Sequence, residues 1–514
     1  MCLLFLFTKE FWLGEADPPS DVKEVFANYS STKMSTKNLH DFLVHRQGNT
    51  DEEARKIGET IFKHKFKHPL SLKDFHRYLF DVELNSPIKA SEVKDDMHAP
   101  LSHYFVFTGH NSYLSGNQLT SESGVDPIIK ALQKGVRVIE LDIWPNSSDD
   151  DIEVYHGNTL TSRVKFVDCL EAIKEHAFSA SPYPVVLNFE NHLTPELQAK
   201  AATMVKQTFG DLLFYPKISS MKEFPSPQSL MNRIIVSAEP PTDVNTSSEY
   251  NNIITIKDGK PKDGLLKETL SAIDSNNVSQ LNLEESDLQE ASESYAPDLA
   301  RFSLNNIIRV YPKGLRIDSS NYDPFPGWIN GAQMVAFNMQ GDGRFLWLMH
   351  GFFLANGGCG YVKKPNFLLH NHLHPQSTLV PLPVKKTLKV KIYTGHGWRS
   401  DFTKSYFDIC SPPDFYVEIG VFGAPSDAVT FKTKKVEDSW TPVWKEEFSF
   451  PLTVPELAVL SIEVSDSEVG KDDFAGQVSF PVSELKNGIR AVPLLDRNGD
   501  KLASVKLLMR FDIT

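Results

Sequence analysis

The chain has 514 residues, and at the usual ~100–200 residues per domain this length implies roughly three to five domains. Apolar residues make up 41% and charged residues 23%, which indicates a folded globular protein and excludes wholesale disorder. The formal net charge of -13 argues against nonspecific nucleic-acid binding, because that activity requires a basic face.

The cysteines and the first residues indicate a cytoplasmic protein. Cys2, Cys169, Cys359 and Cys410 lie far apart and form no CxxC pair, which is typical of an intracellular chain. The apolar start, MCLLFLF, is too short to span a bilayer and lacks the basic residues and cleavage site of a signal peptide. No other apolar run approaches a membrane helix, so if the protein acts on lipid, it reaches the lipid from the side of the bilayer.

The first domain is predicted to be helical. Apolar residues recur at helical spacing from about residue 21 to residue 85, which predicts several short amphipathic helices. We assign residues 20–90 to a helical, EF-hand-like domain. It contains no D-x-[DN]-x-[DN]-G loop with a closing Glu, so calcium binding of the EF-hand kind is not expected there.

An α/β domain is predicted from about residue 96. Its apolar runs, which alternate with helical segments at 126–134 and 167–176, are VRVIELDIW (136–144), PVVLNFE (184–190) and RIIVSAE (233–239). Glu140, Asp142 and Glu190 lie at or near the ends of these runs. Barrel enzymes gather their active sites at the carboxyl ends of the strands, so these acids are candidate functional residues.

The pattern breaks down between residues 240 and 297. Residues 276–295 contain five acidic residues and no Lys or Arg, so we predict a flexible acidic linker over 241–298. Strand-like runs resume at 305–312, 332–340 and 345–353. Neither flank of the linker alone can close a barrel, but their sum of roughly 230 residues approaches the typical ~250. We therefore expect a TIM-like barrel split by the linker into halves at 96–240 and 299–384.

The last domain is predicted to be an all-β sandwich over residues 385–514. Alternating or β-branched runs separated by turn residues fill this region, among them KTLKVKIYTG, DFYVEIGVFG and AVLSIEVSD.

The polar residues at the predicted strand ends suit metal-assisted catalysis. Glu140 and Asp142 are two apart on a strand and so face the same way. His110 and Asn111 lie in TGHNSYLSGNQL (108–119), and His156 lies in YHGNTLTS (155–162). Three carboxylates, one amide and two histidines suit a hard cation such as calcium together with proton transfer, whereas zinc favours more nitrogen or sulfur ligands. Each of these residues alone would more often be a structural ion pair or cap.

Together these motifs resemble those of the phosphoinositide-specific phospholipase C family, in its compact plant type. The resemblance begins with TGHNSYL, RVIELDIW, YHGNTLTS and FENH in the first half of the barrel. It continues with RVYPKGLRIDSSNYDP (309–324), W-x-x-G-AQMVAFNMQ (328–340) and ANGGCGYVKKP (355–365) in the second half. It extends from the helical region to the end of the chain, where the sandwich resembles a C2 domain.

The resemblance implies a catalytic mechanism. It implies that one calcium ion is bound by Asn111, Glu140, Asp142 and Glu190. His110 would stabilise the phosphorane-like transition state, and His156 would protonate the leaving diacylglycerol oxygen. A carboxylate, with Glu140 preferred, would act as general base on the inositol 2-hydroxyl, giving a cyclic phosphodiester that water then opens.

The resemblance also implies a head-group site, and the sequence departs from the family there. Arg309 would bind a ring phosphate and Tyr311 would pack against the ring. After the strand RIIV, however, Ser237 and Glu239 stand where the family carries one or two phosphate-binding lysines. The basic segment with a phosphate-binding serine that the family places before the arginine strand is also absent, and Ser303 cannot be assigned to that role. We expect weaker binding of the 4- and 5-phosphates.

Acidic loops of the C2-like domain are candidates for further calcium binding. The aspartates concerned are Asp408, Asp414, Asp438, Asp466, Asp472 and Asp473. Calcium bound there would bridge an acidic protein to anionic lipid headgroups, and the alternative is that these loops are solvated acidic turns.

The expected function is therefore calcium-dependent cleavage of phosphatidylinositol 4,5-bisphosphate, or a related lipid, to diacylglycerol and a soluble inositol phosphate in lipid signalling. A catalytically impaired, calcium-responsive, lipid-binding adaptor and a barrel phosphodiesterase for glycerophosphodiesters remain as alternatives. The cofactor is Ca2+. The partners are phosphoinositides and an anionic membrane surface, not nucleic acid. We expect a monomer in the cytoplasm, peripheral on the plasma membrane.

Overall fold

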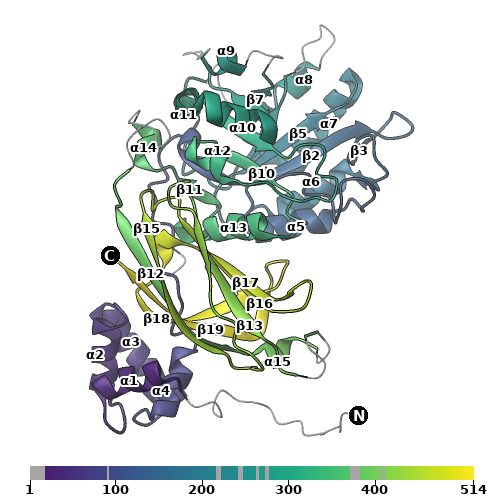
Figure 1. Cartoon of the computed structure of the whole chain (residues 1–514). Coiled ribbons are helices and arrows are strands. Elements are labelled where there is room, and N and C mark those ends of the chain that lie inside the picture. Colours follow the sequence, from purple (N-terminus) through teal and green to yellow (C-terminus); the bar gives the residue numbers. More distant parts are fainter. Residues whose placement is uncertain are drawn as a thin grey trace, which may run out of the picture. The chain divides into compact units, whose positions relative to one another are not determined.

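The structure is a computed structural model of the chain. It describes residues 18–89, 92–215, 221–240, 247–261, 266–271, 277–370, 382–403, 406–407 and 411–514. The chain divides into two compact units (Figure 1). The barrel unit spans residues 91–382, and the helix–sandwich unit combines residues 1–90 with residues 383–514.

The barrel unit is built on a closed ring of parallel strands. In chain order these strands are β1 (Tyr104–Gly109), β2 (Val138–Pro145), β5 (Val185–Asn191), β6 (Ile234–Ala238), β7 (Ile254–Gly259), β8 (Gln280–Glu284), β9 (Ile307–Tyr311) and β10 (Met334–Phe337). Each strand from β2 to β10 pairs with the next of the ring, β10 pairs with β1, and the pairing of Thr108 with Val138 closes the ring. Antiparallel additions lie beside β2 and β1: β3 (Ile152–Val154), β4 (Val164–Lys165) and β11 (Tyr361–Lys363).

Helices surround the barrel strands (Figure 1). They are α5 (Val125–Gln133), α6 (Phe166–His176), α7 (Pro195–Phe209), α8 (Ser248–Asn251), α9 (Leu266–Ser271), α10 (Glu285–Ser294), α11 (Ala296–Asn305), α12 (Phe325–Ile329), α13 (Arg344–Phe352) and α14 (Asn366–Leu369). The alternation of parallel strands and helices confirms the predicted TIM-like barrel.

The interior of the barrel changes from apolar to polar along the strands. Near the amino ends, one cluster of buried residues includes Val138, Val186, Ile235, Ile256 and Ile307. Because side chains two apart on a strand face the same way, the next inward layer is Glu140, Asn188, Ser237, Asp258 and Arg309, all of them buried. The same alternation places a third row at the carboxyl ends, called the rim row here: Asp142, Glu190, Glu239, Lys260 and Tyr311.

The structure differs from the predicted acidic linker. Strands β7 and β8 both lie inside residues 241–298 and complete the ring. In β8 the inward residues are the polar Gln280 and Asn282, while Leu281 and Leu283 face outward. Because polar side chains of β8 fill the barrel interior and its apolar side chains face the helices, the strand shows no continuous apolar run in the sequence. Most of the acidic residues of 276–295 lie in α10, directly after β8.

The run FLWLMHGFF (345–353) is also not a strand, because it lies in α13 (Arg344–Phe352). A continuous apolar run fits a buried strand and a buried helix equally well. Leu346, Trp347, Leu348 and Met349 are all buried, so no exposed face marks the helical period.

The helix–sandwich unit begins with two pairs of helices: α1 (Ser20–Tyr29), α2 (Thr36–His45), α3 (Asp51–Thr60), extended by a π-helical turn at Ile61–Lys65, and α4 (Leu72–Leu79). Ser35, Thr50 and Ser71 start the last three α-helices with capping boxes, which satisfy free backbone N–H groups. A bridge between Met34 and Leu70 joins the loops of the two pairs.

The sandwich consists of antiparallel strands β12 (Lys386–His396), β13 (Phe415–Phe422), β14 (Val429–Lys432), β15 (Val443–Leu452), β16 (Val459–Asp466), β17 (Asp473–Pro481), β18 (Gly488–Leu495) and β19 (Lys501–Ile513), with the short α15 (Trp398–Asp401). They follow the order β14-β13-β16-β17-β18-β19-β12-β15. The helices and the sandwich share one core, in which Tyr393, Ile489 and Leu508 contact the helical cluster. The predicted C-terminal all-β domain is confirmed. Within the described residues, no helix is long and apolar enough to cross a membrane.

Candidate active site

The turn after β1 brings His110 and Asn111 to the mouth of the barrel. Gly109 ends β1, and a Cβ on it would lie 2.2 Å from Ser112 Oγ, so any larger residue would force the Ser112 side chain to move. Asn111 follows with a φ of 43°, a left-handed conformation that asparagine tolerates better than most residues. This tight turn keeps both functional side chains beside the strand end.

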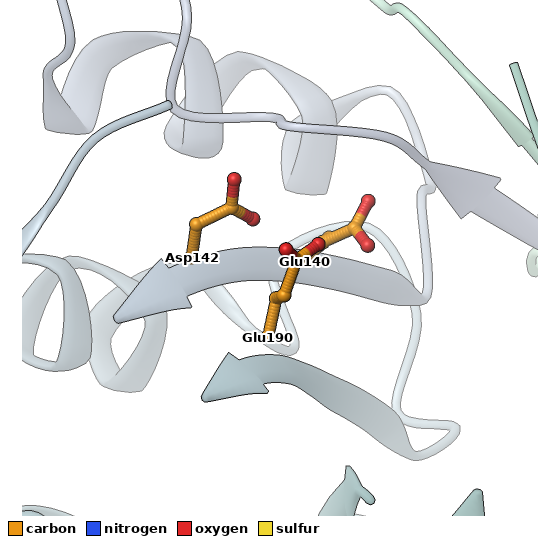
Figure 2. Close-up of side chains that lie close together, drawn as sticks. All are labelled: Glu140, Asp142 and Glu190. Atoms are coloured by element: carbon orange, nitrogen blue, oxygen red, sulfur yellow. The ribbon is translucent and has the colours of Figure 1, made fainter. Parts of the chain in front are cut away.

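Three carboxylates converge at the carboxyl ends of β2 and β5. Asp142 and Glu190 are directly paired residues of the two parallel strands, and Glu140 lies one inward position below Asp142. One oxygen from each of the three lies within 4.8 Å of the others. Figure 2 shows the three side chains reaching toward the same space from the two strands. Sequence reasoning predicted this group, and the geometry brings it together.

Asp142 is buried, and one of its two carboxylate oxygens has no hydrogen-bond partner among the described residues. Its Oδ2 accepts a hydrogen bond from the Tyr113 hydroxyl at 2.8 Å, but its buried Oδ1 has no hydrogen-bond partner in the described structure. Burial raises the pKa of Asp142 well above its usual value, and the charges of Glu190 and Glu140 raise it further. A bound cation would relieve both effects.

Glu190 is the exposed member of the group. His192 Nε2 donates to Glu190 Oε1 at 2.9 Å, and this hydrogen bond is the largest contribution that lowers the pKa of Glu190. The His192 ring stacks on Trp144 with centroids 3.6 Å apart. The Trp144 ring holds the His192 imidazole beside the Glu190 carboxylate. Because the hydrogen bond from His192 lowers the pKa of Glu190, this carboxylate stays ionised.

Glu140 is held from several sides. Its Oε1 lies 2.5 Å from Arg309 Nη2 and accepts from Asn188 Nδ2 at 3.4 Å. Its Oε2 accepts from the Asn111 backbone N–H at 3.3 Å and lies 3.8 Å from His110 Nε2. Arg309, predicted as a phosphate ligand, is therefore paired with a predicted metal ligand in this structure.

The two predicted catalytic histidines share a supporting network. His110 Nδ1 donates to Asn338 Oδ1 at 2.9 Å, and His156 Nδ1 donates to the Gln118 carbonyl at 2.8 Å. Because both partners are oxygens that only accept, each ring has its hydrogen on Nδ1 and leaves Nε2 for other contacts. Gln118 Nε2 also donates to Asn338 Oδ1 at 3.1 Å, so one residue orients both rings. Burial lowers the pKa of His110.

Gln118 also supports Asn111. The Asn111 Nδ2 donates to Gln118 Oε1 at 3.1 Å, which leaves the Asn111 Oδ1 as the oxygen of the predicted calcium ligand. Sequence reasoning assigned no role to Gln118 or Asn338, although Asn338 lies in a motif that carried the resemblance and Gln118 lies four residues beyond another. Two buried amides joined to two histidines are visible only once the fold brings β1 and β10 side by side.

Amides fill the barrel beneath the carboxylates. Gln280 Nε2 donates to Asn188 Oδ1 at 3.3 Å and to Asn282 Oδ1 at 2.9 Å, while Ser237 Oγ donates to Gln280 Oε1 at 3.3 Å. Ser237 is fully buried and committed to this network. Tyr311 is half-buried, and burial raises its pKa.

Three of the predicted C2 aspartates, Asp414, Asp466 and Asp472, accept hydrogen bonds through their side chains. Asp414 Oδ1 accepts from the Asp438 backbone N–H at 2.9 Å, and Asp414 Oδ2 pairs with Lys435 Nζ at 3.0 Å. Asp466 Oδ1 accepts from the Asp414 backbone N–H at 2.6 Å, and Asp472 Oδ2 accepts from the Tyr416 hydroxyl at 2.7 Å.

No three of these aspartates lie within ligating reach of one another in the part of the chain that the structure describes. Within that part the barrel carboxylates are the one such acidic group. Asp408 lies outside the described residues, and calcium binding by the C2 loops stays a prediction.

Family models match three regions of the chain. They are the phosphatidylinositol-specific phospholipase C X domain at residues 97–240, the Y domain of the same enzymes at 265–367, and a C2 domain at 386–494. The X and Y regions together supply the barrel strands that carry the carboxylates, the histidines and Arg309.

Full-length relatives and solved structures agree with these matches. The chain is 45% identical to phosphoinositide phospholipase C 6 of Arabidopsis thaliana, over 98% of this chain and 96% of that protein. It is 30% identical to mouse (Mus musculus) 1-phosphatidylinositol 4,5-bisphosphate phosphodiesterase delta-3, over 96% of this chain and 68% of that protein. The crystal structure of S. officinalis PLC21 superposes with a TM-score of 0.81 at 26% identity, covering 96% of this chain and 68% of that one.

A split barrel with an acidic site at its mouth, joined to a C2 sandwich, defines a phosphodiesterase of the phospholipase C type. The chain belongs to the phosphoinositide-specific phospholipase C family.

Proposed function

We propose that this protein cleaves phosphoinositides to diacylglycerol and a soluble inositol phosphate, in a calcium-dependent reaction at a membrane surface. The observation that carries the proposal is the convergence of Glu140, Asp142 and Glu190 within 4.8 Å beside two oriented histidines. Relatives named as phosphoinositide phospholipases C, at 44–46% identity over nearly the whole chain, support the substrate class.

The donor set fits calcium. Every candidate ligand is an oxygen: three carboxylates and, by resemblance, the Asn111 amide. The buried Asp142 Oδ1 has no hydrogen-bond partner among the described residues, as expected for an atom that binds a cation. A bound calcium ion would lower the pKa of the attacking inositol 2-hydroxyl and offset the charge that develops on the phosphoryl group.

The residues of this chain would then share the proton transfers. His156 acts in its imidazolium form: it donates its Nε2 proton to the leaving diacylglycerol oxygen and keeps its Nδ1–H on the Gln118 carbonyl. Glu140 accepts the proton of the 2-hydroxyl, and its contacts with Arg309 and Asn188 fix the carboxylate for this role. His110 Nε2 donates to a phosphoryl oxygen once the negative charge of the substrate favours the protonated ring.

An apolar rim supports action from the membrane surface. Leu160 and Leu315 are each 83% exposed, and Leu119 and Ile317 are also exposed, all in loops at the barrel mouth. The Leu160 backbone N–H donates to the Leu119 carbonyl at 2.8 Å, and the Gln118 backbone N–H donates to the Ile317 carbonyl at 2.9 Å. These loops therefore lie side by side. Large exposed apolar side chains on loops beside an active site favour lipid contact. We propose that the protein associates peripherally with the plasma membrane.

Hydrolysis of phosphoinositides in mixed vesicles tests the proposal. Diacylglycerol release should require calcium, stop with chelator, and fall at least 100-fold in Asp142→Asn, because the variant loses a carboxylate that the reaction uses. No release at any calcium concentration, together with intact vesicle binding, would instead favour a lipid-binding adaptor.

A further inference from the structure

The rim row holds one cation that sequence reasoning did not single out. On β7, Ile256 lies in the apolar cluster and Asp258, two residues later, is buried in the polar layer. Lys260, two residues further and just beyond the strand, is the next position that faces inward. Lys260 Nζ lies 5.8 Å from the centroid of the Tyr311 ring. After the hydrogen bond from His192, the charge of Lys260 also contributes to the lowered pKa of Glu190. Lys260 thus faces the same opening as Glu190 and Tyr311.

Lys260 is more available to a ligand than Arg309. Arg309 Nη2 is 2.5 Å from Glu140 Oε1 in a buried pair, so much of its charge is already offset. Lys260 is exposed and forms no ion pair with another described residue, and its ammonium lies beside the Tyr311 ring. An exposed ammonium beside an aromatic ring suits a phosphate carried by a ring that packs on the tyrosine.

Carboxylates lie at the carboxyl ends of the two strands that neighbour this lysine's strand. Glu239 follows β6 and Glu284 ends β8, the two strands that pair with β7. Glu239 is exposed and Glu284 is half-exposed. Glu284 also accepts a hydrogen bond from the Ser286 hydroxyl at the start of α10. The single ammonium of Lys260 can hold one phosphate, but a second phosphate on a neighbouring ring carbon would meet the negative charges at the ends of β6 and β8.

We propose that Lys260 binds a single monoester phosphate on the inositol ring, and that Glu239 and Glu284 disfavour a second one. The inference rests on the proposed function and narrows its substrate class to singly phosphorylated inositol lipids.

Turnover of matched lipids tests the proposal. The substrates are phosphatidylinositol, its 3-, 4- and 5-monophosphates and the 4,5-bisphosphate, each in vesicles of constant composition with calcium. Wild type should have its highest kcat/KM on one of the monophosphates. Lys260→Gln should lower that value on the order of 10- to 100-fold more than the value for phosphatidylinositol, because a charged hydrogen bond is lost. Lys260→Arg should retain most of it.

Lys257→Gln is the matched control, because Lys257 is an exposed lysine on the other face of the same strand, and it should change none of the values. An equal loss of kcat/KM on all substrates in Lys260→Gln would overturn the proposal, and so would a wild-type preference for the bisphosphate. Either result would still agree with the proposed phosphodiesterase function.

Calorimetry with soluble head groups makes the test independent of turnover. The ligand is the soluble inositol bisphosphate that has the head group of the preferred monophosphate lipid, with its 1-phosphate and its one ring phosphate. If no lipid is cleaved, inositol 1,4-bisphosphate is used, and in either case the full-length protein should bind it. Lys260→Gln should weaken that binding about 10-fold or more. Unchanged affinity in the variant would refute the role of Lys260, even in a protein that hydrolyses nothing.

Discussion

Replacing Asp258 with asparagine should stabilise the barrel at neutral pH. Asp258 is a buried carboxyl on β7 that accepts a hydrogen bond from Asn282, and burial raises its pKa to about 6 from a usual 3.8. The charge of Arg309 on β9 lowers this pKa, while Glu239, directly after β6, and Glu140 on β2 raise it. The folded state therefore favours the protonated form of Asp258.

The size of the effect follows from the two pKa values. A difference of about 2 pKa units corresponds to about 3 kcal/mol of destabilisation when the carboxyl is ionised in the folded protein at pH 8. The stabilising contribution of the proton is present in full below pH 3.8 and is lost as the pH rises through about 6. At pH 4.5 the remaining cost is about 1 kcal/mol.

Differential scanning calorimetry of the full chain measures this prediction. Asp258→Asn should raise the Tm of the barrel transition by roughly 6 °C or more at pH 8, and by much less at pH 4.5. Asp149→Asn is the control, because Asp149 is exposed in the same unit and has a φ of 55° that asparagine tolerates equally. A gain in Asp258→Asn that is the same at both pH values, or a loss at pH 8, would refute the assignment of Asp258 as a buried, poorly compensated charge.

Three further variants test the site and the rim. His156→Ala should abolish product formation, by at least 100-fold, while leaving vesicle binding unchanged; persistent turnover would remove His156 from the role of acid. Glu239→Lys should raise kcat/KM on the bisphosphate lipid about 10-fold more than on phosphatidylinositol, and an equal effect on both would show that residue 239 does not face the ring phosphates. Leu160→Ser with Leu315→Ser should weaken vesicle binding at least 10-fold in a sedimentation assay, since burial of each leucine is worth about 1.5–3 kcal/mol; unchanged binding would exclude the apolar rim as a lipid contact.

The parts of the fold with a clear apolar period were predictable from sequence. Strands β2, β5 and β6 are mostly buried runs rich in aliphatic residues, and the sandwich strands β13 and β16 place their aliphatic residues in the core, so the structure confirms these predicted strands. Strand β8 was missed because its inward residues, Gln280 and Asn282, are polar and belong to the barrel interior. Its polarity looked like that of a solvated linker, since sequence alone does not reveal which side of a strand faces a polar interior.

The site residues that lie in recognisable motifs were predictable from sequence, but the contacts between strands far apart in the chain were not. Glu140, Asp142 and Glu190 converge as the spacing and the parallel strand pairing imply. The contact between Arg309 and Glu140 joins β9 to β2, and its existence depends on the closed ring. Lys260 was passed over for the same reason, because it lay in a segment predicted to have no fold.

Calcium binding to the full chain tests the central claim most directly. Titration calorimetry should give one bound calcium fewer per chain in the double variant Asp142→Asn, Glu190→Gln than in wild type, with loss of phosphoinositide hydrolysis in the same preparation. An unchanged number of bound calcium ions, or undiminished hydrolysis in the variant, would contradict a catalytic cation held by the carboxylates of β2 and β5.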